Sequence, residues 1–217
     1  AGETLRKALT LAPQDPELLA EAGNLATARG EMEPALDFYR RAVAADPVNA
    51  QARSYLAGYL AVAKQYEEAR AEYARAIELN SAAPYYHAGL GSTYLLEGKL
   101  EEAASAAQAD TAEWARLTLM ACILWSQKRI PESDAALDQL IKSSAETAAY
   151  QIADVYAYRG DKDRAFEWLE RARRQRDAGL PGLRSDPYLA NLTGDPRWSA
   201  FLRAMGLADD QLKLGAR

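Results

Sequence analysis

The sequence contains very few of the residues from which most catalytic and metal sites are built. One cysteine, Cys122, and one histidine, His87, occur among its 217 residues. A single cysteine cannot form a disulfide within the chain, and this pair cannot supply the usual zinc ligand sets. No motif ties a nucleophile or a carboxylate to His87, and Cys122 lies in an apolar stretch that favours a small buried side chain. We therefore expect no catalytic residues, no metal and no cofactor.

The sequence also lacks an apolar run of the roughly 20 residues that a membrane span requires. No signal-peptide pattern opens it. Its net charge of −5 gives no general attraction to nucleic acid or to anionic lipid. With 49% hydrophobic residues, the chain can bury a large core. We expect a soluble protein that is most simply cytoplasmic, with the periplasm as the alternative.

Alanine is abundant and makes up about a fifth of the chain. Such a content favours closely packed helices. Similar residues recur 34 positions apart: Pro13 and Pro47 are one such pair, and Tyr39 and Tyr73 are another. The same step joins the alanines at 8, 42 and 76, and those at 35, 69 and 103. The chain is therefore built from an internal repeat.

Each period has the pattern of two helices joined by a turn. Gly23, Ala57 and Gly91 supply a small residue to the first helix, and Gly30 and Gly98 mark the turn into the second. A period of 34 residues with this pattern is typical of the tetratricopeptide repeat. The fullest match is the stretch 90–103, which contains Leu-Gly-Ser-Thr-Tyr, a glycine and an alanine at the expected spacings. The chain resembles a tetratricopeptide repeat protein from about residue 3 to 176.

This resemblance implies an all-α fold, a right-handed superhelical solenoid of antiparallel helix pairs. The register shortens after the third repeat, and Ser133 and Leu140 stand in the fourth where the family usually has alanines. A non-repeat helical hairpin is the alternative there. The expected segments are the second helix of a truncated repeat at 1–13, repeats at 14–47, 48–81, 82–113, 114–145 (divergent) and 146–177, and a C-terminal cap and tail at 178–217.

The two ends of the chain carry further information. The chain starts on what resembles a second helix, which indicates a piece of a longer protein; a processed terminus or a helix that caps the stack alone is the alternative. Near the other end, Asp186-Pro187 and Asp195-Pro196 are each typical of a helix start. The apolar residues after the second start share one helix face and predict a capping helix: Trp198, Phe201, Leu202 and Met205.

The stretch from Ala165 to Leu207 is similar to the C-terminal repeat regions of bacterial multidomain signalling proteins. These include winged-helix regulators, nucleotide cyclases and serine/threonine kinases. The similarity implies a regulatory or protein-binding region whose output domain lies upstream. The sequence at 188–194 departs from the commonest form.

In the family, the first helix of each pair lines a concave groove. The resemblance places these residues at or near its inward positions: Glu17, Asn24, Tyr55, Tyr85, Ser92, Trp125, Tyr150, Asp154 and Tyr158. Only Asn24 matches the carboxylate-binding clamp of chaperone-binding members. Aromatic rings with two acidic groups favour an extended partner segment with apolar and basic side chains. The alternative is that several of these tyrosines only fill spaces between neighbouring helices.

The sequence thus predicts a non-catalytic scaffold that binds a protein or peptide in its concave groove, as the C-terminal regulatory region of a larger bacterial protein. The alternative is an oligomerisation module of that parent protein with no external ligand. Leu5 and Leu9 of the first helix would then mediate self-association through the amino-terminal edge.

Overall fold

The computed structural model describes residues 2–214, and side chains are described for 2–212. Residue 1 and residues 215–217, which belong to the expected segments 1–13 and 178–217, lie outside this description. The described chain contains α-helices and two short 3₁₀ helices. They are α1 (Gly2–Leu11), α2 (Pro16–Ala28), α3 (Met32–Ala45), α4 (Ala50–Val62), α5 (Tyr66–Leu79), α6 (Tyr86–Glu97), α7 (Leu100–Gln108), α8 (Glu113–Ser126), α9 (Ile130–Ser144), α10 (Ala149–Tyr158), α11 (Lys162–Gln175), η1 (Leu180–Ser185), η2 (Pro187–Leu192), α12 (Pro196–Ala204) and α13 (Asp209–Leu214).

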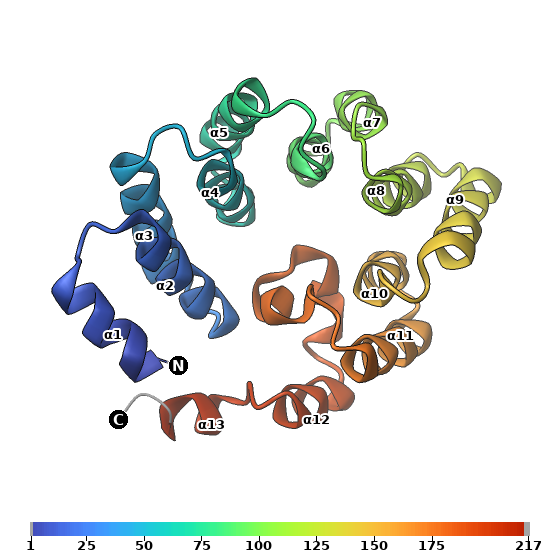
Figure 1. The fold of residues 1–217 in the computed structure, drawn as a ribbon. Coiled ribbons are helices and arrows are strands. Elements are labelled where there is room, and N and C mark those ends of the chain that lie inside the picture. Colours follow the sequence, from blue (N-terminus) through green and yellow to red (C-terminus); the bar gives the residue numbers. More distant parts are fainter. Residues whose placement is uncertain (1, 215–217) are drawn as a thin grey trace.

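The helices α2 to α11 form consecutive antiparallel pairs arranged in an arc (Figure 1). The first helix of each pair lies on the concave side of the arc, and the second lies on the convex side. The first helices of neighbouring pairs also contact one another: α4 contacts α6, and α8 contacts α10. The predicted all-α solenoid of helix pairs is confirmed.

Local sequence signals explain where the helices begin and turn. The Asp15 carboxylate accepts hydrogen bonds from the backbone amides of Glu17 and Leu18 at 3.0 Å, and Pro16 opens α2. This satisfies amides that have no partner inside the helix. At the turns between paired helices, Gly30 and Gly98 have φ values of +74° and +84°, which glycine adopts without strain.

Small residues let paired helices approach closely, as the repeat pattern predicts. A Cβ atom at Gly23 would lie 2.7 Å from the ring of Tyr39, and one at Gly91 would lie 3.0 Å from the backbone oxygen of Ala103. Both distances are shorter than a normal van der Waals contact. These two positions therefore require glycine for packing between helices.

The pair α8–α9 packs like the other pairs although its sequence diverges. Leu140 and Ser133 are both fully buried in it. The Ser133 hydroxyl donates a hydrogen bond of 2.5 Å to the carbonyl oxygen of Ala121 in α8, so the polar group is not left without a partner. Serine and leucine thus replace alanine without disrupting the pair.

After α11 the chain crosses to the concave side of the arc. The segment 180–192, which contains η1 and η2, lies inside the arc against α2 and α10 (Figure 1). Its four leucines, Leu180, Leu183, Leu189 and Leu192, are at most 4% exposed and belong to the same hydrophobic cluster as α8 and α10. We call this segment the inner segment.

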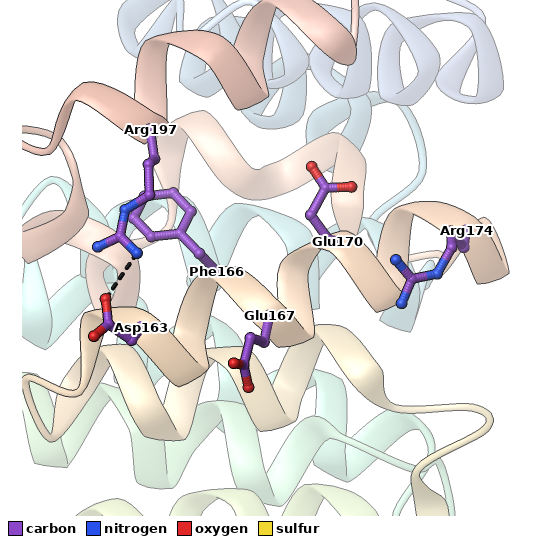
Figure 2. Close-up of a pocket in the computed structure, with 6 residues that line it drawn as sticks. All are labelled: Asp163, Phe166, Glu167, Glu170, Arg174 and Arg197. Carbon is purple, nitrogen blue, oxygen red and sulfur yellow. Dashed lines mark hydrogen bonds and ion pairs between the residues drawn. The ribbon is translucent and has the colours of Figure 1, made fainter.

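Helix α12 then packs against α11. Trp198 and Phe201 are buried, and the Arg197 guanidinium lies 4.4 Å from the centre of the Phe166 ring. Arg197 also forms ion pairs of 2.8 Å with Asp163 of α11 and with Asp195; Figure 2 shows its contact with Asp163 beside an open depression of about 600 Å³. These contacts place α12 over the last helix pair.

The inner segment also joins the two ends of the arc. The Ser185 hydroxyl donates to the carbonyl oxygen of Thr27 in α2 at 3.4 Å. The Arg184 guanidinium donates to the carbonyl oxygen of Leu207 and to the carboxylate of Asp209, at 2.5 and 2.7 Å. The first repeat is therefore held to the C-terminal helices through this segment.

Candidate partner-binding surface

The inner segment divides the nine residues that the sequence places in the groove. Glu17 and Asn24 in α2 are exposed, Tyr55 in α4 is half-buried, and Tyr85 at the start of α6 is 47% exposed. Four others contact the inner segment or lie beneath it: Ser92, Tyr150, Asp154 and Tyr158. Trp125 is half-buried in α8. We call the exposed surface of α2, α4 and the start of α6 the open face.

Hydrogen bonds tie the inner segment to the covered residues. The Tyr150 hydroxyl donates to Asp186 Oδ2 at 2.8 Å, and the hydroxyls of Ser92 and Tyr188 lie 2.7 Å apart. The ring centres of Tyr158 and Tyr188 are 5.6 Å apart. The Tyr150 and Asp154 side chains are about 95% buried, so neither is available to a partner in this structure. Their expected place in a partner site does not hold for this conformation, because the chain's own segment occupies the position.

Asp154 is an unusual group in this buried region. Its Oδ1 atom is buried and accepts no hydrogen bond. Burial raises the pKa of Asp154 well above its usual value, and the negative charges of Asp186 and Asp177 raise it further. Burial also raises the pKa of Asp186, although hydrogen bonds from the Tyr188 amide and the Tyr150 hydroxyl act in the opposite direction. The environment thus favours a protonated Asp154.

Connected tyrosines of α3 and α4 lie at and beneath the open face. The Tyr39 and Tyr59 rings are stacked with their centres 5.2 Å apart, and the Tyr39 and Tyr55 centres are 5.8 Å apart. Tyr39 itself is fully buried, and its hydroxyl donates to Asn24 Oδ1 at 2.7 Å. The Tyr55 hydroxyl accepts a hydrogen bond of 2.8 Å from Gln51. The hydrogen bond from the buried Tyr39 hydroxyl therefore fixes the orientation of the Asn24 amide, while Asn24 itself stays exposed.

Two functional candidates beside Tyr85, one in the loop before α8 and one in its first turn, are not among the residues that the sequence predicts. Trp114 is half-buried, and its ring lies nearly parallel to that of Tyr85, with centres 6.3 Å apart. Asp110 is 3% exposed and accepts hydrogen bonds from three backbone amides. The only sequence signal for Trp114 was an aromatic residue in the first turn of an inner helix.

Other groups with reactive side chains do not form a site. Cys122 is fully buried, and burial raises the pKa of its thiol. His87 is half-buried near the start of α6. Among residues 2–214, no group of three or more histidine, cysteine, aspartate or glutamate side chains is placed to hold a metal ion. No helix in that range has the length and hydropathy needed to cross a membrane.

A family model described as tetratricopeptide repeat matches residues 1–50, 19–86, 55–113 and 118–181. The chain belongs to the tetratricopeptide repeat family. Mouse and human protein O-mannosyl-transferase TMTC1 are 33% and 32% identical to it over 104 residues, which is 46% of this chain. The chain aligns with only 11% and 12% of the length of these relatives.

Solved tetratricopeptide structures show the same fold at low sequence identity. YrrB, described as a tetratricopeptide protein with an unusual peptide-binding site, is 21% identical with a TM-score of 0.52 and covers 84% of this chain and 97% of its own. A tetratricopeptide repeat protein from Parabacteroides merdae is 16% identical with a TM-score of 0.65 and covers 83% of this chain and 75% of its own. These structures support the fold alone.

Proposed function

We propose that this tetratricopeptide repeat protein is a non-catalytic scaffold that binds an extended segment of a partner protein on its open face. The observation that carries the proposal is that Glu17 and Tyr85 are exposed and Tyr55 is half-buried on the part of the concave side that the inner segment leaves uncovered. Family membership and the solved structure of a peptide-binding tetratricopeptide protein agree with it.

The energetics favour binding beside the inner segment over its displacement. Burying one leucine stabilises a fold by about 1.5–3 kcal/mol, so the four buried leucines contribute roughly 6–12 kcal/mol before strain and entropy are subtracted. A ligand of micromolar affinity gains about 8 kcal/mol in total. A partner that displaced the segment would therefore lose most of its binding free energy.

The chemistry of the open face suits a partner with basic and apolar side chains. Glu17 and Glu21 are exposed on α2, and tyrosines follow on α4 and α6. Arg53 is the arginine of α4, and it is paired with Glu72 at 2.5 Å. Carboxylates beside aromatic rings attract cations, and the rings provide contact area with little loss of side-chain entropy.

The proposal can be tested by selecting ligands from a displayed library of random peptides against the full chain. The best peptide is then synthesised, and its affinity is measured by calorimetry for Glu17→Lys and Tyr55→Ala. Glu33→Lys is the matched control, because Glu33 is an exposed glutamate in the first turn of an outer helix.

We expect Tyr55→Ala to weaken binding about fivefold or more, as removal of a central aromatic contact does. Glu17→Lys should weaken binding of a basic peptide, and Glu33→Lys should leave it unchanged. Equal effects of the two charge reversals, or wild-type affinity in Tyr55→Ala, would contradict the proposed site.

A second candidate function is oligomerisation of a larger parent protein through the amino-terminal edge. Helix α1 has no fully buried side chain, and Leu11 is 88% exposed. Exposed apolar surface of this kind tends to associate. Sedimentation should then show concentration-dependent association that weakens when Leu5 and Leu9 are changed to serine. A monomer at every concentration would rule this candidate out.

We also propose that the chain is the C-terminal regulatory region of a longer, bacterial signalling protein and that it acts in the cytoplasm. The support is the resemblance of residues 165–207 to such regions. The sequence of the parent protein tests this directly, since an upstream output domain is expected.

A further inference from the structure

The backbone of Tyr85 is strained. Its φ is +79°, in the left-handed region that residues other than glycine seldom adopt. The other described non-glycine residues with positive φ, Lys64, Lys128 and Arg176, all follow the C-terminal end of a helix, where this conformation is common. Tyr85 instead precedes a helix. Such strain persists only where surrounding structure holds it, and it is concentrated at functional sites.

The buried Asp110 carboxylate holds this conformation. Its Oδ1 atom accepts from the amides of Tyr85 and Ala112 at 3.1 and 2.9 Å, and its Oδ2 atom accepts from the amide of Ala88 at 2.8 Å. One side chain therefore connects the start of α6 to the loop before α8. This fixes Tyr85 relative to Trp114, which lies in the first turn of α8.

The two rings form a fixed aromatic pair. Their planes differ by 15° and their centres are 6.3 Å apart, while Tyr85 remains 47% exposed. The Tyr85 backbone is held in its strained conformation, so the exposed ring cannot turn away from water by relaxing the backbone. A ligand that covers the ring would remove this contact with water. The pair is thus organised in advance for a contact that residues 2–212 do not supply.

The rest of the molecule shows which side chain suits an aromatic ring of this kind. Six arginines lie over aromatic rings at 4.4–5.6 Å; the pairs are Arg41 with Phe38, Arg70 with Tyr94, Arg159 with Trp125, Arg164 with Tyr156, Arg171 with Trp168, and Arg197 with Phe166. No described cation lies over Tyr85 or Trp114. The nearby Arg116 directs its guanidinium to the carbonyl oxygen of Asp110, at 3.4 Å.

We infer that the Tyr85–Trp114 pair binds an arginine side chain of the partner segment. This inference rests on the proposed function and assigns one subsite of it. The exposed carboxylates of Glu17 and Glu21 on the same open face provide complementary charge. A planar guanidinium stacks on rings more effectively than an ammonium group does.

The test uses the full chain and the capped pentapeptide glycine-proline-arginine-proline-glycine. Matched peptides carry lysine or the neutral isostere citrulline in place of arginine. Binding is followed by NMR through the indole N–H of Trp114, assigned with Trp114→Phe. Tyr85→Ala removes the ring, Tyr85→Phe keeps it, and Trp168→Leu is the control, because Trp168 is also half-buried but already carries Arg171.

We expect the arginine peptide to bind about 2- to 30-fold more tightly than the citrulline peptide and to shift the Trp114 resonance. Tyr85→Phe and Trp168→Leu should retain this preference, and Tyr85→Ala should lose it while helicity measured by circular dichroism stays unchanged. If Tyr85→Ala fails to fold, Trp114→Leu takes its place; because this variant lacks the indole reporter, its affinities for the arginine and citrulline peptides are measured by calorimetry, and the preference should be lost.

Equal affinity for the arginine and citrulline peptides would overturn the inference, as would shifts that map away from Trp114. The proposed function would still stand if the selected peptide depended on Glu17 and Tyr55. If binding of the selected peptide did not depend on Glu17 and Tyr55 while the arginine preference at Trp114 remained, Glu17 and Tyr55 would not belong to the binding surface. The arginine subsite would then stand, and the proposed open face would be wrong.

Discussion

At the scale of single residues, Asp154 shows how the inner segment changes the chemistry of the groove. On a bare concave face, this carboxylate would be solvated and charged. Beneath the segment it is 5% exposed, and the groups that influence its pKa are Asp186 and Asp177, with no cation among them. Burial without a positive partner favours the neutral form of the acid. A residue suited to attract a basic ligand has become part of the protein interior.

The raised pKa of Asp154 predicts a particular dependence of stability on pH. The folded-state pKa lies above the unfolded value of about 3.9, so the unfolded chain releases this proton first as pH rises. The stability contributed by the protonated group is present below about pH 4 and is lost as pH rises toward the folded-state pKa.

Asp154→Asn removes this titration, so the variant should become progressively more stable relative to the wild type as pH rises from 4 to 7. Urea denaturation across this range measures the difference. Asp138→Asn on the exposed side of α9 is the control and should show no such trend. A wild-type to Asp154→Asn difference that stays constant with pH would refute the assignment.

Glycine positions provide a second prediction at this scale. A Cβ atom at Gly91 would meet the Leu119 side chain at 2.7 Å and the Ala103 backbone oxygen at 3.0 Å, whereas at Gly58 it would meet only the Tyr73 hydroxyl at 3.3 Å. Gly91→Ala should therefore lower the free energy of unfolding by about 1–3 kcal/mol. Gly58→Ala should cost less, because alanine favours the helix. Thermal unfolding compares them, and a larger loss for Gly58→Ala would contradict the packing.

At the scale of elements, the inner segment behaves as part of the core. Leu192 of η2, which packs against α10, is fully buried, whereas Leu11 at the end of α1 is 88% exposed. Leu192→Ala should cost about 2–5 kcal/mol. Leu11→Ala should change stability by less than about 0.5 kcal/mol. Equal small effects in urea denaturation would mean that the segment is only loosely docked.

The helix pairs could be predicted from the sequence because their signals are local. Proline after aspartate, glycine at turns and small residues at fixed spacing each specify one step of the chain. The position of the inner segment could not be predicted in this way. Its leucines at 180, 183, 189 and 192 follow neither one helical period nor a strand alternation, and their burial depends on helices 30 to 160 residues away in sequence.

The candidate site was partly predictable for the same reason. The repeat register places Glu17, Tyr55 and Tyr85 at or near inward positions, and in the structure Glu17 and Tyr85 are exposed and Tyr55 is half-buried. Their part in binding a partner stays a prediction. The register gave no sign that Tyr150 and Asp154 would be covered. The role of Asp110 depends on the strained backbone of Tyr85, which lies 25 residues away, and no spacing pattern encodes it.

At the scale of the whole molecule, the C-terminal region both fills and closes the arc. Arg184 contacts the α12–α13 connection, and its neighbour Ser185 contacts α2 of the first repeat. The chain itself therefore covers part of the concave side, and we propose that the exposed remainder, the open face, binds a partner.

Hydrogen exchange, measured by mass spectrometry with and without the selected peptide, tests this division most directly. Binding on the open face should slow exchange in 16–28, 50–62 and 84–90, and leave 149–158 and 180–192 unchanged. Faster exchange in 180–192 together with slower exchange in 149–158 would show that the peptide displaces the inner segment, and it would contradict the account.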